Sequence, residues 1–72
     1  MSRDEWQKQF GLRLSEKRRL LRWSQAELAE RVALDKQTIY RYERGIASPD
    51  ALRIAILCEH LGCQSDWLLG LD

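Results

Sequence analysis

Hydrophobic residues recur at helical intervals along most of this chain. Trp6, Phe10 and Leu14 lie four residues apart, and Leu21 follows two turns later. This spacing predicts a helix over residues 4–21 with one face on a core. With only 4 Gly and 1 Pro, the chain has too few turn-forming residues for a strand-and-turn fold, so an all-α fold is favoured.

Capping signals divide the next part of the chain into short helices. Ser24 is followed three residues later by Glu27, a capping-box pattern that predicts a helix over 25–32. Asp35 is the expected cap of a third helix over 36–44. The apolar positions expected to face the core in these two helices are Ala26, Leu28, Ala29, Val32, Ile39 and Tyr42.

Glycine and proline mark the remaining boundaries. Gly45 is expected to end the third helix in a left-handed conformation. Ser48, as a cap, and the proline after it, at the first helical position, predict a fourth helix over 49–60. Gly62 ends that helix, and a last short helix is expected over 65–69. The predicted buried stripe of the fourth helix is Leu52, Ile56, Leu57 and Leu61.

Composition limits the chain to one small domain spanning residues 1–72. Of these residues 44% are hydrophobic and 32% charged, with 4 Gly and 1 Pro, which favours a compact helical domain over a disordered one. A core of this size is marginal, so dimerisation would help. The aromatic residues expected to support the core are Trp6, Trp23 and Trp67.

No segment resembles a membrane span or a secretion signal. Apolar runs reach only three or four residues, whereas a span needs about 20. The first residues lead into no apolar signal region, so we expect a cytoplasmic protein.

Positive charge is concentrated in the first part of the chain. Residues 1–45 hold 11 Lys and Arg against 7 Asp and Glu, while residues 46–72 hold 1 against 4. The corresponding net charges, +4 and −3, give the total of +1. This asymmetry predicts that one face meets a polyanion, although the pI of about 7.8 is below the value of about 9 typical of strongly basic nucleic-acid modules.

The two cysteines do not form a recognisable metal or redox motif. Cys58 and Cys63 are five residues apart and close to His60, the only histidine, which matches neither zinc-ligand spacing nor a redox pair two residues apart. We interpret both as small buried hydrophobes and expect no disulfide in a cytosolic protein. No metal or cofactor is implied.

The second and third predicted helices, joined by a tight turn, form an arrangement that can place side chains in the major groove of DNA. Several separate motifs here closely resemble the phage repressor and Cro class, or XRE-like class, of helix-turn-helix domains. They occur in the expected order over about residues 12–70. They are Ser24-Gln25-Ala26-Glu27-Leu28-Ala29, Thr38-Ile39, Tyr42-Glu43-Arg44-Gly45, and Leu61-Gly62 with Asp66-Trp67-Leu68-Leu69. The resemblance implies a compact five-helix, lambda-repressor-like DNA-binding domain.

The resemblance also implies that residues 36–44 form the recognition helix, with base contacts from Lys36, Gln37 and Arg41. Their chemistry fits independently, because Gln can pair with adenine while Lys and Arg suit the acceptors of guanine. The alternative is an ordinary solvated helix face.

A second set of residues is expected at the DNA backbone. The resemblance implies that Gln25 binds a phosphate, and Arg22 and Arg44, beside helix ends, could add salt-dependent affinity. Thr38 and Tyr40 are secondary candidates, for a phosphate or a thymine methyl group. Either arginine could equally be an idle surface charge.

Family members carry a structural ion pair where this chain has Arg18 and Glu43, and we expect the same role here. The chain also departs from the family pattern. Ala33 and Arg22 stand where glycine is common. We expect either a strained turn or a slightly different turn geometry at Ala33, and a longer first helix at Arg22. Asp35 brings a negative charge near DNA, which is tolerable if it caps the helix.

These observations favour a sequence-specific regulator of transcription that binds double-stranded DNA, and we expect a repressor acting as a homodimer on a palindromic operator. Dimerisation is assigned to the C-terminal leucines, although these could instead pack on the chain's own first helix. They are Leu68, Leu69 and Leu71. An alternative is an antitoxin-like or adaptor protein whose main partner is another protein. An enzyme lacks support, because the only histidine has no evident partner and no phosphate-binding glycine loop occurs.

Overall fold

The computed structural model describes residues 1–71, and its first helix, α1, spans Arg3–Leu20. Ser2 caps this helix, since its hydroxyl accepts a hydrogen bond from the Glu5 N–H over 3.2 Å. The helix therefore lies one residue nearer the N-terminus than the periodicity predicted.

The buried face of α1 follows the predicted spacing over most of its length. Phe10 and Leu14 are fully buried, and the partly buried Trp6 ring stacks on Phe10 with centroids 5.2 Å apart. Leu21 departs from the prediction, because it lies just past the helix end and remains 37% exposed.

The capping box forms as predicted at the start of α2, Gln25–Arg31. The Glu27 N–H donates to the Ser24 hydroxyl, and the Ser24 N–H donates to the Glu27 carboxylate, both over 3.0 Å. Two backbone donors that would otherwise lack partners are thus satisfied.

The next helix, α3, spans Lys36–Arg44, and a residue in the left-handed conformation lies beyond each of its ends. Asp35 caps its start as predicted, and Gly45, with φ 74°, ends it. Ala33 takes φ 58° in the turn before α3, where an alanine side chain is unfavourable. The expected strain at this turn is therefore present.

The start of α4, Ala51–Leu61, differs from the prediction. Asp50, not Ser48, is the cap, and its carboxylate accepts a hydrogen bond from the Arg53 N–H over 2.9 Å. Pro49 is buried one residue before the cap instead of occupying the first helical turn. Aspartate competes for the cap because its carboxylate also carries the charge that the helix dipole favours.

The predicted buried stripe of α4 is partly wrong. Leu57 and Leu61 are buried, together with Cys58, whereas Leu52 is 69% exposed. Leu52 lies about 140° around the helix from Leu57, so a face centred on Leu57 and Leu61 turns Leu52 to solvent. Ala26 of α2, also expected in the core, is likewise exposed.

The last helix, α5, spans Ser65–Leu69 and packs against the chain's own first helix. Leu68 is fully buried in the core, and the Trp6 indole N–H donates to the Leu69 carbonyl over 3.1 Å. The assignment of Leu68 to a dimer interface is therefore wrong, because its side chain is used within the chain. Leu71 is 71% exposed.

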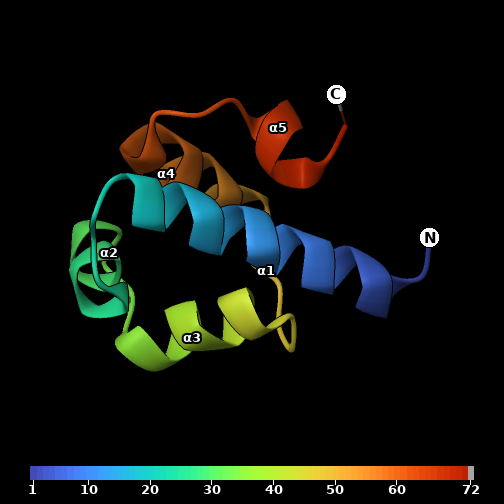
Figure 1. The fold of residues 1–72 in the computed structure, drawn as a ribbon, viewed down its shortest axis with the longest axis horizontal. Helices are drawn as coiled ribbons and strands as arrows, with labels where there is room; N and C mark the ends of the chain where they lie inside the picture. The colour runs from blue at the N-terminus through green and yellow to red at the C-terminus, as the bar shows by residue number, and fades with distance from the viewer. Residues whose placement is uncertain (72) are drawn as a thin grey trace.

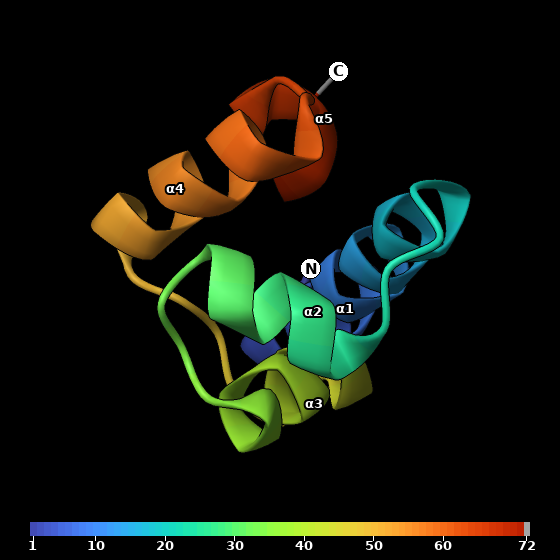
Figure 2. The ribbon, with the colours of Figure 1, turned by 90° about the vertical axis from the view of Figure 1, so that its left-hand side faces the viewer.

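Five helices and no strand make up the described residues, in the order α1 to α5. In Figure 1, α1 crosses the middle of the molecule, with α3 below it and α4 and α5 above. Figure 2 shows the same order from the side, with α2 in front and α3 at the lower edge. The buried core consists of Phe10, Leu14, Leu28, Ala29, Val32, Ile39, Tyr42, Leu57, Cys58, Leu61 and Leu68. The tryptophans at positions 6, 23 and 67 are partly buried against this core.

Gly11 brings α1 and α3 close together. A Cβ atom at this position would lie 2.5 Å from the Tyr42 carbonyl oxygen and 2.6 Å from that of Glu43. Both atoms belong to the backbone of α3, which cannot swing aside as a side chain can. The crossing of α1 and α3 therefore requires glycine at position 11.

None of the described helices is long and apolar enough to cross a membrane.

Candidate nucleic-acid interface

One face of α3 is free of the rest of the chain. Lys36, Gln37 and Arg41, the predicted base-contacting residues, are all exposed, whereas Ile39 and Tyr42 on the opposite side are buried. In both ribbon views α3 lies at the lower edge of the molecule (Figures 1 and 2). The first two turns of α3 therefore present their polar side chains outwards.

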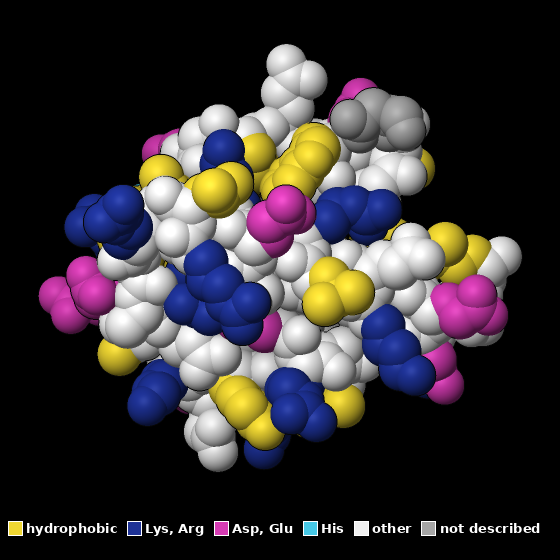
Figure 3. All heavy atoms as spheres, in the orientation of Figure 1, with side chains coloured by type: hydrophobic (Ala, Val, Ile, Leu, Met, Phe, Trp, Pro, Cys, Tyr) yellow, Lys and Arg dark blue, Asp and Glu magenta, His cyan; other side chains and the backbone are white. Residues whose placement is uncertain are grey.

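Basic side chains are prominent on this side. Figure 3 shows Lys and Arg side chains along the lower edge, where α3 lies in the same orientation. Arg41 and Arg44 both belong to the last turn of α3, and both are exposed. Such a surface attracts an anionic partner.

The Asp35 carboxylate at the start of α3 is held within the helix cap. One oxygen, Oδ1, accepts hydrogen bonds from the Thr38 N–H over 2.7 Å and from the Thr38 hydroxyl over 2.8 Å. These two bonds hold the pKa of Asp35 below its ordinary value. Asp35 therefore stays ionised at neutral pH in the capping role expected for it.

The same bonds restrict Thr38. Its hydroxyl proton is used by Asp35, so the hydroxyl oxygen has only acceptor capacity left. A DNA phosphate also offers only acceptors. Thr38 in this conformation therefore suits a phosphate poorly.

Two further candidates for DNA contact, Tyr40 and Arg44, lie together on α3. The Arg44 guanidinium carbon is 5.8 Å from the centre of the Tyr40 ring, within range of a cation–π interaction. Tyr40 is 41% exposed, so the pair remains accessible.

Arg22 lies in the turn between α1 and α2. It is exposed and takes φ 62°, and α1 ends before it, at Leu20. The expectation that Arg22 lengthens the first helix was therefore wrong. The arginine adopts the left-handed conformation that glycine provides more easily.

A buried hydrogen-bond network fixes α3 to its neighbours. Arg18 on α1 donates from Nε to Glu43 Oε2 over 2.6 Å and from Nη2 to Glu43 Oε1 over 2.9 Å. Its third nitrogen, Nη1, donates to the Trp23 carbonyl over 2.7 Å. The hydrogen bonds that Arg18 donates to the Glu43 carboxylate raise the pKa of Arg18. The expected ion pair thus forms, with both side chains almost completely buried.

Gln25, the predicted phosphate ligand, also belongs to this network. Its amide nitrogen donates to Glu43 Oε1 over 3.1 Å, and its side chain is partly buried. A glutamine amide has two N–H donors, so one remains for a second acceptor. The network therefore positions Gln25 at the start of α2.

A contact made by Arg31 was not predicted from the sequence. Its guanidinium carbon lies 4.2 Å from the centre of the Trp23 ring, a cation–π contact between the end of α2 and the residue before its cap. The two residues are eight apart and meet only because the chain turns sharply into α2. No helical spacing rule could have signalled this contact.

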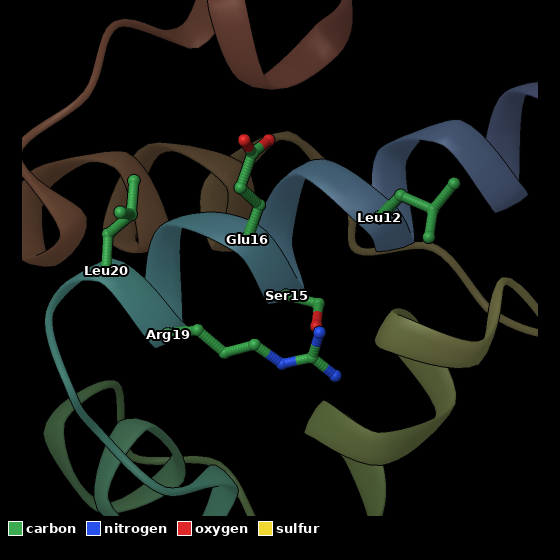
Figure 4. A pocket seen from close by; sticks show the side chains of 5 residues that line it. All are labelled: Leu12, Ser15, Glu16, Arg19 and Leu20. Atoms are coloured by element: carbon green, nitrogen blue, oxygen red, sulfur yellow. The ribbon is translucent and has the colours of Figure 1, made fainter.

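A hollow of about 470 Å³ lies on α1, lined by Leu12, Ser15, Glu16, Arg19 and Leu20. Leu12, Glu16 and Leu20 extend from one side of the helix, whereas Ser15 and Arg19 lie on the other (Figure 4). The Glu16 carboxylate therefore does not reach the Ser15 hydroxyl. The hollow does not pair a nucleophile with a base.

Comparison with known proteins identifies this arrangement. The profile of the helix-turn-helix family matches residues 14–68. A search of curated protein sequences finds no significant match.

Two solved structures share the fold. The restriction-modification controller protein C.AhdI from Aeromonas hydrophila is 28% identical, with a TM-score of 0.87 over 94% of this chain and 99% of that one. The clp gene regulator ClgR from Corynebacterium glutamicum is 23% identical, with a TM-score of 0.84 over 92% of this chain and 70% of that one.

Proposed function

Because this chain belongs to the helix-turn-helix family of DNA-binding regulators, we propose that it reads a specific sequence of double-stranded DNA through the exposed face of α3. One observation carries the proposal. Lys36, Gln37 and Arg41 point outwards from a helix whose opposite face, with Ile39 and Tyr42, is fixed in the core. A helix held in this way can enter the major groove without rearranging the domain.

The three side chains offer different base contacts. Lys36 and Arg41 suit the N7 and O6 acceptors of guanine, and Gln37 suits the N6 donor and N7 acceptor of adenine. Each well-placed bidentate contact discriminates against a wrong base by about 1–3 kcal/mol.

Contacts to the DNA backbone are assigned to residues in and around α3. Gln25 uses its remaining N–H for a phosphate, while Arg22 and Arg44 supply charge that adds affinity without selecting sequence. Tyr40 stays a secondary candidate beside Arg44. Thr38 is better suited to contact a thymine methyl group through its own methyl group, because its hydroxyl is engaged with Asp35.

We further propose that the protein acts as a homodimer and represses transcription. Leu71 is exposed and Leu69 partly so, which leaves apolar area at the C-terminal end of the fold that a second copy would cover. A symmetric dimer presents two copies of α3 to half-sites about one helical turn, or about 10 base pairs, apart. A repressor would then occlude the promoter by occupying such an operator.

Selection of bound sequences from a random DNA pool tests this proposal. The expected result is an enriched motif with two-fold symmetry and a centre-to-centre spacing of about 10 base pairs. Substituting Lys36, Gln37 and Arg41 together by alanine should abolish the enrichment while the domain stays folded. If the sequences recovered with the native protein showed no enriched motif, specific recognition would be refuted.

A further inference from the structure

The two cysteines meet where α4 ends. Gly62 turns the chain with φ 68°, and the Cys63 N–H donates to the Cys58 carbonyl over 3.1 Å. The Gly62 N–H donates to the same Cys58 carbonyl, and a glycine cap of this kind is frequently accompanied by contact between the side chains that flank it. In this chain both of those side chains carry sulfur.

The backbone holds the cysteines within reach of a covalent bridge. Given the 3.1 Å between Cys63 N and Cys58 O, standard bond lengths place the two Cα atoms at most about 7 Å apart. Disulfides span Cα separations of about 4.4–6.8 Å. Burial, together with the neighbouring Cys63 side chain, raises the pKa of the Cys58 thiol to about 11.

The two thiols differ in access. Cys58 is only 8% exposed, whereas Cys63 is partly exposed and lines a groove of about 420 Å³ beside Lys17, Leu20 and Trp67. A small reagent in solution can therefore reach Cys63 directly but not Cys58. Both thiols are free in the reduced protein.

We propose that Cys58 and Cys63 form a site of reversible oxidation, in which a small disulfide such as oxidised glutathione drives formation of an intramolecular disulfide. The Cys63 thiolate attacks the reagent and releases one glutathione thiolate, leaving a mixed disulfide. Cys58 then loses its proton and attacks the Cys63 sulfur, which releases the second glutathione thiolate. The protein loses two electrons and two protons, and the reagent gains the electrons.

The bridge would act on the junction between α4 and α5. It would close the six-residue loop from Cys58 to Cys63 and hold the turn at Gly62, from which the chain continues to Leu68 in the core. Because the reduced turn already holds the two Cα atoms within about 7 Å of each other, we expect oxidation to stabilise the native fold. This inference does not depend on DNA binding.

Equilibration of the purified protein with mixtures of reduced and oxidised glutathione tests the proposal. After acid quenching, mass spectrometry should show that the oxidised protein has lost two hydrogen atoms and carries no bound glutathione. The ratio of disulfide to dithiol should be about tenfold or more higher in native buffer than in denaturing urea at the same glutathione ratio. The oxidised protein should also unfold at a higher temperature.

Two variants separate the roles of the thiols. Cys58→Ala should accumulate the mixed disulfide on Cys63, because no resolving thiol remains. Cys63→Ala should leave Cys58 unreacted in native buffer. A stable mixed disulfide in the unmutated protein, or an equal or lower disulfide ratio in native buffer than in urea, would overturn the proposal even if a variant fails to fold.

Discussion

At the scale of single residues, Glu43 joins the three helices on the α3 side of the molecule. It accepts hydrogen bonds from Arg18 on α1 and Gln25 on α2 while belonging to α3 itself. Removing Glu43 would leave a buried, unpaired guanidinium, which is strongly destabilising. Glu43 therefore fixes the orientation of α3 relative to α1 and α2.

Arg41→Ala should relax sequence preference at one base pair of the operator half-site. The loss of a bidentate contact to guanine should cost about 1–3 kcal/mol on the preferred sequence and much less on sequences that lack that guanine. Arg44→Ala is the matched control, since it removes the same charge from the same helix and should weaken all sequences alike. Titration of labelled duplexes measures both, and uniform losses for both variants would contradict the roles assigned.

Ala33→Gly should stabilise the protein by about 1 kcal/mol, because glycine adopts the φ of 58° seen at this position without steric cost. The free energy of unfolding from urea titration measures the change. Ala55→Gly in the exposed interior of α4 is the control and should destabilise by about 1 kcal/mol. A loss of stability in the Ala33 variant would show that this turn is not strained.

At the scale of helices, sequence predicts an element well where the determining contacts are local. The capping box at Ser24 and Glu27 formed as expected, because all its atoms lie within four residues. The predicted start of α4 was wrong because Ser48 and Asp50 are both suitable caps, and the charged carboxylate of Asp50, which the helix dipole favours, takes the role.

In the candidate site too, local contacts were predictable from the sequence and contacts between separate elements were not. Helical spacing and the family resemblance together predicted the exposed face shared by Lys36, Gln37 and Arg41. The hydrogen bond from Gln25 to Glu43, the stacking of Arg31 on Trp23 and the burial of Leu68 depend on how separate elements meet in space. Periodicity within one helix carries no information about such contacts.

The cap of α3 makes stability depend on pH. Asp35 has a lowered pKa in the folded state, so its stabilising contribution is present above its unfolded pKa of about 3.9 and is lost as pH falls through the folded value. Asp35→Asn should keep the cap, because asparagine caps equally well, but should not titrate. The native protein should therefore lose more stability than the variant as the pH falls from about 5 to about 2, a range that spans the carboxylate pKa.

Urea titrations at several pH values measure this difference. The other carboxylates titrate in both proteins, so subtracting the two curves isolates Asp35. Parallel curves would show that the Asp35 carboxylate contributes nothing through its ionisation.

At the scale of the whole molecule, the C-terminal leucines differ in burial, and the proposed dimer predicts different effects of substituting them. Leu71→Ser should weaken self-association with little effect on the folding of each copy, since its side chain is 71% exposed. Leu68→Ala should instead destabilise the fold by about 2–5 kcal/mol, because it removes a fully buried side chain. Sedimentation equilibrium and thermal unfolding distinguish the two effects, and unchanged self-association in the Leu71 variant would place the interface elsewhere.

At Gly11 the backbones of α1 and α3 lie close together with no side chain between them, which restricts sliding or tilting of one helix against the other. In the proposed homodimer, each copy of α3 would therefore meet the duplex at a fixed angle. Where the curvature of the duplex does not match that angle, the DNA would have to deform to restore the contacts. We expect the protein to favour operators whose central base steps bend easily, even where no side chain touches them.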